Sequence, residues 1–272
     1  MTTTGDTDGQ RHEPASDTLF AEVGRCRLEY VDLPASGPDR PALVFLHEGL
    51  GCVEMWRGFP THVAERTLCR TVVYSRQGYG RSDPLDAPRT PRYLHDEALE
   101  VLPVLRDVLG LDRVVLIGHS DGASIALIHA GAGRWPVEGL VAMAPHEFVE
   151  DVTLAGIRAT GRDWETTDVA RRIGRYHRDP EQVFRAWYDT WLSPAFRDWN
   201  IEEHLPGIRC PILAVQGEDD GYATMAQLDA ITALATAAAT VEQLRLPACG
   251  HSPHQDQESA VTDAIARFIR FR

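Results

Sequence analysis

The chain has 272 residues, a length suited to one catalytic domain with an insertion, and 43% of its residues are hydrophobic, as in ordinary globular proteins. Its 40 acidic and 27 basic residues give a net charge of -13, which repels phosphate backbones and anionic membranes, so we expect no nucleic-acid or membrane partner. All 27 basic residues are arginines, and the lack of lysine excludes Schiff-base chemistry, pyridoxal-phosphate attachment and the phosphate-binding loop of nucleotide hydrolases.

Residues 1–18 are polar and show no periodicity, which predicts a disordered N-terminal tail. This opening segment has neither the basic start nor the apolar core of a signal peptide. The longest apolar runs are far shorter than the ~20 residues that span a bilayer. The five cysteines are scattered and include no C-x-x-C pair, which is typical of buried thiols in a reducing compartment. We therefore expect a cytoplasmic protein, either a monomer or a homo-oligomer.

Residues 19–33 contain two short alternating stretches around Gly24, which predict an antiparallel hairpin at the edge of a sheet. Short apolar runs then alternate with helical segments, and this alternation predicts an α/β fold with an open, mostly parallel sheet and helices on both faces. The expected strands are 42–46, 71–74, 114–117, 140–144, 212–215 and 241–246. The expected helices are 94–109, 120–132, 222–235 and 257–271.

Residues 148–206 interrupt this alternation, because they contain no convincing strand and are helical in pattern. Such an excursion between two strands predicts a helical lid over the carboxyl ends of the sheet, with residues 19–147 and 207–272 forming the core. The lid is rich in aromatic residues, of which we expect Trp187 and Trp191 to face a pocket. His146, which follows strand 140–144, is a further candidate for the pocket wall.

The strongest signal is Gly118-His119-Ser120-Asp121-Gly122, a G-x-S-x-G pattern between an apolar strand and a helix. We call residues 118–122 the elbow. A nucleophile on such a tight turn has strained backbone geometry, and side chains at the flanking glycines would collide with the neighbouring strand and helix. The turn raises the serine hydroxyl above the sheet, close to the positive end of a helix dipole. We therefore interpret Ser120 as a nucleophile.

Serine needs a base to remove its proton, and the base in turn needs an acid to orient it. After the last strand the chain reads Cys249-Gly250-His251-Ser252-Pro253-His254, and His251 is preferred over His254 because it directly follows the glycine. After strand 212–215 it reads Gly217-Glu218-Asp219-Asp220-Gly221. Asp220 is the preferred acid and Asp219 the alternative. These residues follow the chain order of nucleophile, then acid, then histidine, which is one of the orders found in known catalytic triads.

The oxyanion formed in acyl transfer needs backbone N–H donors. We expect one from Asp121, the residue after the nucleophile, and the other from the loop His47-Glu48-Gly49-Leu50-Gly51, where Gly49 is the candidate. Glu48 is unusual, because a carboxylate beside an oxyanion would repel the developing charge. We expect its side chain to point away and to tie down a neighbouring loop through Arg76 or Arg81, while we also count it among the candidate pocket residues.

The eleven histidines and five cysteines show no H-E-x-x-H pattern and no tight Cys/His cluster. Zinc sites usually display such close spacing of their ligands in the sequence. We therefore expect no metal site and no cofactor, with a small molecule as the substrate.

With these residues in place, the sequence resembles the α/β-hydrolase fold family, and specifically its lidded serine hydrolases, over residues 19–272. The resemblance is carried by Leu46-His47-Glu48-Gly49-Leu50-Gly51, Gly78-Tyr79-Gly80-Arg81-Ser82, the elbow, Gly217-x-x-Asp220 and Gly250-His251. The family's acid usually lies three positions after the glycine, which favours Asp220 over Asp219. The family's oxyanion loop commonly reads His-Gly, so the presence of Glu48 at that glycine is a departure.

The resemblance implies a serine hydrolase that acts on an ester, lactone or thioester through Ser120, His251 and Asp220. The serine at the elbow argues against dehalogenase-like and epoxide-hydrolase-like activity, since those similar proteins use an aspartate there. A first alternative is carbon–carbon hydrolysis of vinylogous diketones, for which the lid arginines Arg171, Arg172, Arg175 and Arg185 could bind acidic substrate groups. A second alternative, from another class, is a hydrolase-derived ligand receptor with slow turnover.

Overall fold

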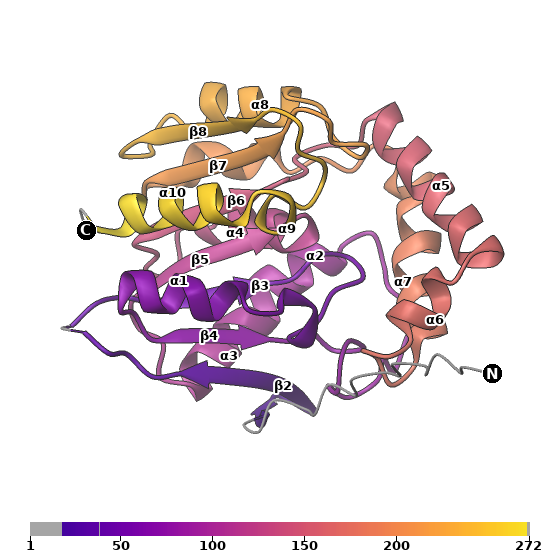
Figure 1. Cartoon of the computed structure of the whole chain (residues 1–272), viewed down its shortest axis with the longest axis horizontal. Helices are drawn as coiled ribbons and strands as arrows, with labels where there is room; N and C mark the ends of the chain where they lie inside the picture. Colours follow the sequence, from indigo (N-terminus) through magenta and orange to yellow (C-terminus); the bar gives the residue numbers. More distant parts are fainter. Residues whose placement is uncertain (1–17, 38, 271–272) are drawn as a thin grey trace, which may run out of the picture.

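A computed structural model of the chain, which describes residues 18–37 and 39–270, contains one eight-stranded sheet (Figure 1). The strand order is β1-β2-β4-β3-β5-β6-β7-β8. β1 and β2 form an antiparallel hairpin, β2 is antiparallel to β4, and all later pairings are parallel. The strands are β1 Leu19–Val23, β2 Cys26–Leu33, β3 Ala42–Leu46, β4 Thr71–Tyr74, β5 Val114–His119, β6 Gly139–Met143, β7 Ile212–Gly217 and β8 Val241–Leu246.

This sheet confirms the predicted fold class, an open and mostly parallel α/β sheet that begins with a hairpin. Of the six strands predicted after the hairpin, three begin and end at the predicted residues, and the other three differ by one or two residues at one or both ends. The predicted tail, up to residue 17, lies outside the described residues. In the described part of the chain, no helix combines the length and the apolar character that crossing a membrane requires.

Helices cover both faces of the sheet because the strands are apolar on both sides. α1 and α10 lie in front of the sheet in Figure 1, while α3 and α4 lie behind it. Successive strand residues alternate between the two cores: Phe45 of β3 packs in the core under α1 and α10, and Val44 and Leu46 pack in the core under α4. The helices of this core domain are α1 Phe59–Thr67, α2 Tyr93–Asp96, α3 Leu102–Val108, α4 Asp121–Gly131, α8 Ala226–Leu234, α9 Pro253–Asp256 and α10 Glu258–Arg270.

Two predicted helices differ from the observed ones. The expected helix 94–109 is divided into α2, a π-helical turn η2 at Glu97–Val101, and α3, which has Pro103 in its first turn. The expected helix 222–235 starts only at Ala226, because residues 221–225 form an irregular turn. Helix α1 was not predicted.

Residues 148–206 form a helical segment between β6 and β7. Figure 1 shows its helices α5, α6 and α7 grouped beyond the end of the sheet at which the parallel strands finish. A single antiparallel bridge between Phe148 and Asn200 joins the two ends of the segment. Its helices are α5 Asp151–Thr166, α6 Val169–Ile173, α7 Pro180–Trp191 and the short η3 Pro194–Phe196, and η4 Glu202–Gly207 leads back to β7.

Candidate active site

The elbow places Ser120 at the junction of β5 and α4. Ser120 has φ 52° and ψ -118°, a strained conformation for a residue with a side chain. A Cβ at Gly118 would overlap the backbone of Gly122 and Ala123, and a Cβ at Gly122 would overlap the carbonyl oxygen of Leu46. The two glycines therefore allow β3, β5 and α4 to approach closely enough to hold this turn.

Ser120, His251 and Asp220 form one hydrogen-bonded line. His251 Nε2 lies 3.0 Å from Ser120 Oγ, and His251 Nδ1 lies 2.8 Å from Asp220 Oδ2. An ionised carboxylate can only accept hydrogen bonds, so Nδ1 carries the proton of the neutral ring and Nε2 accepts from the serine hydroxyl. The imidazole is thus oriented as a base toward Ser120.

Asp220 is held in place by more than the histidine. Its carboxylate accepts hydrogen bonds from Gln216 Nε2 at 2.6 Å and from the backbone N–H of Tyr222 at 2.7 Å. Burial favours the neutral acid, but the hydrogen bond and charge of His251 and the Tyr222 N–H outweigh it, and the pKa of Asp220 is lowered. The alternative acid Asp219 is exposed, so the geometry favours Asp220. Gln216 had no signal in the sequence.

His254, the alternative base, lies apart from this line. Its ring packs against Trp56 and Phe59, with centroid distances of 4.8 Å and 5.3 Å, and is 4% exposed. Burial, with the charges of His251 and Arg57, lowers the pKa of His254 to about 3. Its neighbour His119 donates from Nε2 to the carbonyl oxygen of His251 at 2.7 Å and so supports the loop that carries His251.

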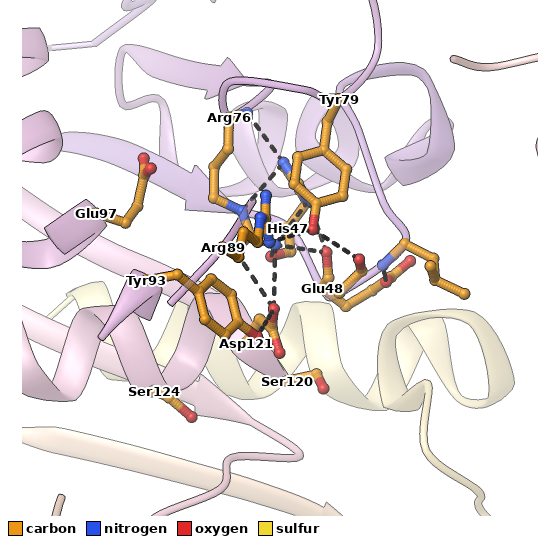
Figure 2. A network of polar contacts seen from close by, with 12 residues as sticks. His47, Glu48, Arg76, Tyr79, Arg89, Tyr93, Glu97, Ser120, Asp121 and Ser124 are labelled. Atoms are coloured by element: carbon orange, nitrogen blue, oxygen red, sulfur yellow. Dashed lines mark hydrogen bonds and ion pairs between the residues drawn. The ribbon is translucent and has the colours of Figure 1, made fainter. Parts of the chain in front are cut away.

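The loop of residues 47–51, which we call the β3 loop, lies beside the elbow and is fixed by buried side chains from outside it (Figure 2). Arg76 Nη2 donates to the Glu48 carbonyl oxygen at 2.9 Å, and the Tyr79 hydroxyl donates to the Gly49 carbonyl oxygen at 2.9 Å. Trp187 packs directly on Gly49, where an added Cβ would overlap the indole.

Glu48 does not behave as the sequence suggested. Its carboxylate accepts a hydrogen bond from the backbone N–H of Leu50, within its own loop. Arg76 reaches only the carbonyl oxygen of Glu48, and Arg81 is paired with Glu29 instead. Glu48 is one of the residues that line the Ser120 pocket, so its side chain does not point away from the site. Burial raises the pKa of the Glu48 carboxyl.

The side chain of Asp121 belongs to a buried network of polar side chains (Figure 2). Its Oδ2 atom accepts a hydrogen bond from the Tyr93 hydroxyl at 2.7 Å and lies 3.4 Å from Arg76 Nη1. Tyr93 in turn accepts a hydrogen bond from Trp191 Nε1 at 2.8 Å. Because Arg76 and Asp121 are only 1% exposed, each charge depends on the other for compensation. The network links the residue after Ser120 to α7.

A cavity of about 230 Å³ opens at Ser120. The predicted pocket residues Glu48, Gly49, Asp121, His146, Trp187 and Trp191 all line it, together with His251. Sequence reasoning missed several apolar and aromatic lining residues: Leu50, Met55, Ile157, Ile173 and Tyr222. A larger, shallower depression of about 600 Å³ lies between residues 85–91 and α7, but it contains none of the three hydrogen-bonded residues, and we assign the chemistry to the Ser120 cavity.

The arginines of the helical segment do not reach this cavity. Arg171 and Arg172 are exposed and pair with Asp168, and Arg185 pairs with Glu181. Among the described residues, no arginine lines the Ser120 pocket. The cationic partners that a diketone acid would need are therefore missing from the pocket wall.

One group of side chains elsewhere has a metal-ligand composition. His95 of α2 and the pair Glu203 and His204 of η4 place one ligand atom each within 4.8 Å of one another. None of the three lines the Ser120 pocket. The sequence showed no such cluster because His95 and His204 are far apart along the chain.

The fold and this site are those of the α/β hydrolases, with a serine on a strand-to-helix turn and a histidine delivered by the last loop. The sequence profile of the alpha/beta hydrolase family matches residues 43–264. This match covers most of the chain, and the chain belongs to the alpha/beta hydrolase family.

Curated relatives match the chain over a shorter part. A haloalkane dehalogenase from Sphingobium indicum is 30% identical over 132 residues, which are 48% of this chain and 43% of that protein. A haloalkane dehalogenase from Mycolicibacterium smegmatis is 33% identical over 132 residues, or 48% of this chain and 40% of that protein. The chain thus spans less than half the length of these relatives.

Solved structures match the fold over nearly the whole chain. An enol-lactonase from Burkholderia xenovorans LB400 superposes with a TM-score of 0.70 at 19% identity, covering 92% of this chain and 99% of that one. A proline iminopeptidase from Mycobacterium smegmatis superposes with a TM-score of 0.72 at 17% identity, covering 93% and 97%. At these identities the likeness concerns the fold alone.

Proposed function

We propose that the chain is a serine hydrolase that cleaves a small ester, lactone or thioester by acyl transfer. The observation that carries the proposal is the line from Asp220 through His251 to the Ser120 hydroxyl. His251 takes the serine proton at Nε2 while Ser120 Oγ attacks the carbonyl carbon, and Asp220 stabilises the imidazolium that forms. His251 then returns the proton to the leaving oxygen or sulfur.

The oxyanion of each tetrahedral intermediate would be held by the backbone N–H groups of Gly49 and Asp121, which both line the Ser120 pocket. Water enters after the leaving group departs and loses a proton to His251 as it attacks the acyl carbon. Collapse of the second intermediate releases the acid and restores the serine hydroxyl. This cycle uses only protein groups and water.

We further propose that residues 148–206 act as a cap over this site. The support is that Trp187 and Trp191 of α7 line the pocket and that Trp187 packs on Gly49. The cap would restrict water and give the cavity its apolar wall.

The test is the Ser120→Ala variant, assayed with p-nitrophenyl esters of graded acyl length and labelled with a fluorophosphonate. We expect turnover to fall by ~10⁴-fold or more and labelling to vanish, with the fold retained by circular dichroism. Ser259→Ala, on the exposed face of α10, serves as the matched control and keeps both signals. Near-normal activity of Ser120→Ala would contradict the proposal. Tight ligand binding without turnover by the wild type would instead favour a ligand receptor.

A further inference from the structure

Glu48 brings an uncompensated carboxylate into the Ser120 pocket. Its Oε2 atom accepts the Leu50 N–H, while Oε1 lies over Gly51, where an added Cβ would be only 2.9 Å from it. In the described part of the chain, Oε1 has no hydrogen-bond donor assigned to it. Asp121, the other acidic residue of the pocket wall, is engaged through Oδ2 by Arg76 and Tyr93, while its Oδ1 atom is buried without a hydrogen-bond partner. Among the described residues, Glu48 is therefore the acidic residue of the pocket wall that has no paired cation.

Among the described residues, no cation is paired with the Glu48 carboxylate: burial raises its pKa, and the more distant charges of Arg76 and His251 only partly oppose that rise. The Arg76 guanidinium is directed to the Glu48 carbonyl oxygen and to Asp121 (Figure 2). His146 is kept neutral, since burial and the nearby His251 lower its pKa to about 4, and burial also lowers the pKa of His119 well below its usual range. A carboxylate without a counter-charge in such a place is costly and would repel the oxyanion formed next to Gly49.

The rest of the wall is suited to a positive charge. Trp187, Trp191 and Tyr222 line the same cavity, and Trp187 packs on Gly49, the residue next to Glu48. Aromatic faces attract ammonium groups, most strongly where the site is desolvated, and a carboxylate beside them adds a charge of the opposite sign. The cavity of about 230 Å³ limits this group to a small one.

We propose, resting on the serine hydrolase function above, that the preferred substrate carries a cationic ammonium group, which Glu48 binds beside the scissile carbonyl. The cation neutralises Glu48 and so removes the repulsion between Glu48 and the developing oxyanion. Neutral esters of the same shape leave that repulsion in place. Glu48 then determines substrate specificity. This role accounts for a glutamate at the position where the family's oxyanion loop commonly has glycine.

Two pairs of isosteric esters test this. Acetylcholine and 3,3-dimethylbutyl acetate differ in charge on the alcohol side, and the p-nitrophenyl esters of 4-aminobutanoate and pentanoate differ on the acyl side. We expect kcat/KM to be at least about 10-fold higher for the cationic member of one pair, equivalent to about 1.4 kcal/mol. The pair that shows the difference identifies the side on which the ammonium binds.

Glu48→Gln should abolish this preference, by raising KM for the cationic ester and raising kcat for the neutral one. Glu54→Gln, an exposed glutamate six positions along, should keep the wild-type ratio. An equal ratio in wild type and Glu48→Gln, or an equal loss of kcat on both esters, would overturn the inference. If the wild type neither turns over any ester nor reacts with the fluorophosphonate, the proposed function itself fails instead.

An independent observation concerns His95, Glu203 and His204. The atoms His95 Nδ1 and His204 Nε2 are buried without a hydrogen-bond partner in the described structure, and the two rings lie 5.4 Å apart between centroids. Unpaired buried nitrogens are uncommon, because they lose their hydrogen bonds to water. Two imidazoles and one carboxylate are a common donor set for zinc, with bonds of about 2.0–2.2 Å. The three ligand atoms lie within 4.8 Å of one another, and a bound ion would draw them closer together.

We infer, against the expectation from the sequence, that these three residues bind a divalent zinc-like ion that joins α2 to η4. His204 lies against α4, since a Cβ at Gly131 would overlap the His204 carbonyl oxygen. The ion would therefore anchor η4, which leads from the helical segment back to β7, beside α4, the helix that begins directly after Ser120. Its role would be structural, because none of the ligands lines the Ser120 pocket.

Equilibrium dialysis of metal-free protein against Zn²⁺ alone, with the thermal midpoint as a second readout, tests this. We expect one strongly bound ion per chain and a rise in the midpoint, both lost in the double variant His95→Ala, His204→Ala. His62→Ala, at an exposed histidine paired with Glu258, should retain both. Binding that is unchanged in the double variant, or absent from the wild type, would overturn the inference.

Discussion

The elbow and the β3 loop lie next to each other at the ends of paired strands, yet they are held by different means. The elbow is shaped by backbone contacts, since Gly118 and Gly122 leave no room for a Cβ. The β3 loop is shaped by side chains that arrive from elsewhere, with Arg76 and Tyr79 holding two of its carbonyl oxygens.

This difference separates two tasks in the proposed mechanism. The elbow fixes the nucleophile through local geometry that changes little with the substrate. The β3 loop carries both a proposed oxyanion donor, Gly49, and the charge of Glu48, so it joins catalysis to selectivity. Its shape depends on the buried pair of Arg76 and Asp121. We expect the two regions to fail in different ways when they are altered.

The largest effect should come from the base that serves the elbow. His251→Ala removes the group bonded to Ser120, and we expect kcat to fall by about 10⁴-fold. His254→Ala leaves that bond in place and should lower kcat by less than about 10-fold, through looser packing near His119. Steady-state kinetics on one p-nitrophenyl ester compares the two. If the larger loss fell on His254, the assignment of the base would be reversed.

Removal of Arg76 should damage the β3 loop and the stability together. Arg76→Met leaves Asp121 buried without its counter-charge, and we expect the free energy of unfolding to fall by about 3–5 kcal/mol. The surviving folded enzyme should lose kcat more than it changes KM, since the Glu48 carbonyl is released. Arg81→Met, at a half-exposed arginine, should cost about 1 kcal/mol or less. Urea titration measures the loss of unfolding free energy in both variants. If Arg76→Met lost no more than Arg81→Met, the buried pair would contribute little to stability.

Gly122→Ala should test the elbow by its backbone alone. The added Cβ overlaps the Leu46 carbonyl oxygen, so β3 and α4 must separate. We expect this separation to lower the free energy of unfolding by about 3 kcal/mol. Gly221→Ala is the matched control, because nothing lies within 4 Å of a Cβ there. We expect its thermal midpoint to match the wild type. A fully stable Gly122→Ala protein would mean that the elbow is looser than its contacts indicate.

The features that could be predicted from the sequence are those that depend on a local pattern of residues. The apolar strands around Phe45 could be placed because burial on both faces leaves a continuous apolar run. The elbow could be placed because its two glycines lie close in the sequence to the serine whose turn they allow. The helix α1 was missed, and the π-helical turn η2 had no pattern that distinguishes it from an α-helix.

What could not be predicted depends on contacts between residues that are distant in the sequence. Arg76 and Asp121 are separated by 45 positions, and nothing near either residue shows that they meet. The same holds for Gln216, whose amide supports Asp220 from within an apolar strand. Glu48 was expected to face away because charge repulsion was considered without the geometry of Leu50, whose N–H holds the carboxylate in the pocket wall.

The smallest expected effect is a change in the pH dependence of stability, and it concerns the packing behind the elbow. The pKa of His254 is lowered to about 3, because burial and the charges of His251 and Arg57 oppose protonation. A lowered folded-state pKa means that the unfolded chain binds more protons than the folded chain between about pH 3 and 6.5. The stability linked to this neutral ring is therefore present above pH 6.5 and is lost as the pH falls toward 3.

His254→Phe keeps an aromatic ring against Trp56 and Phe59 but removes the titrating group. Between pH 7.5 and pH 5, we expect the variant to lose about 2 kcal/mol less unfolding free energy than the wild type. Both proteins keep two further buried histidines with lowered pKa values, His47 in the β3 loop and His119 in the elbow. Both should therefore still lose stability in acid. Urea midpoints at the two pH values measure the difference, and parallel losses in the two proteins would show that His254 is protonated as easily in the folded chain as in the unfolded one.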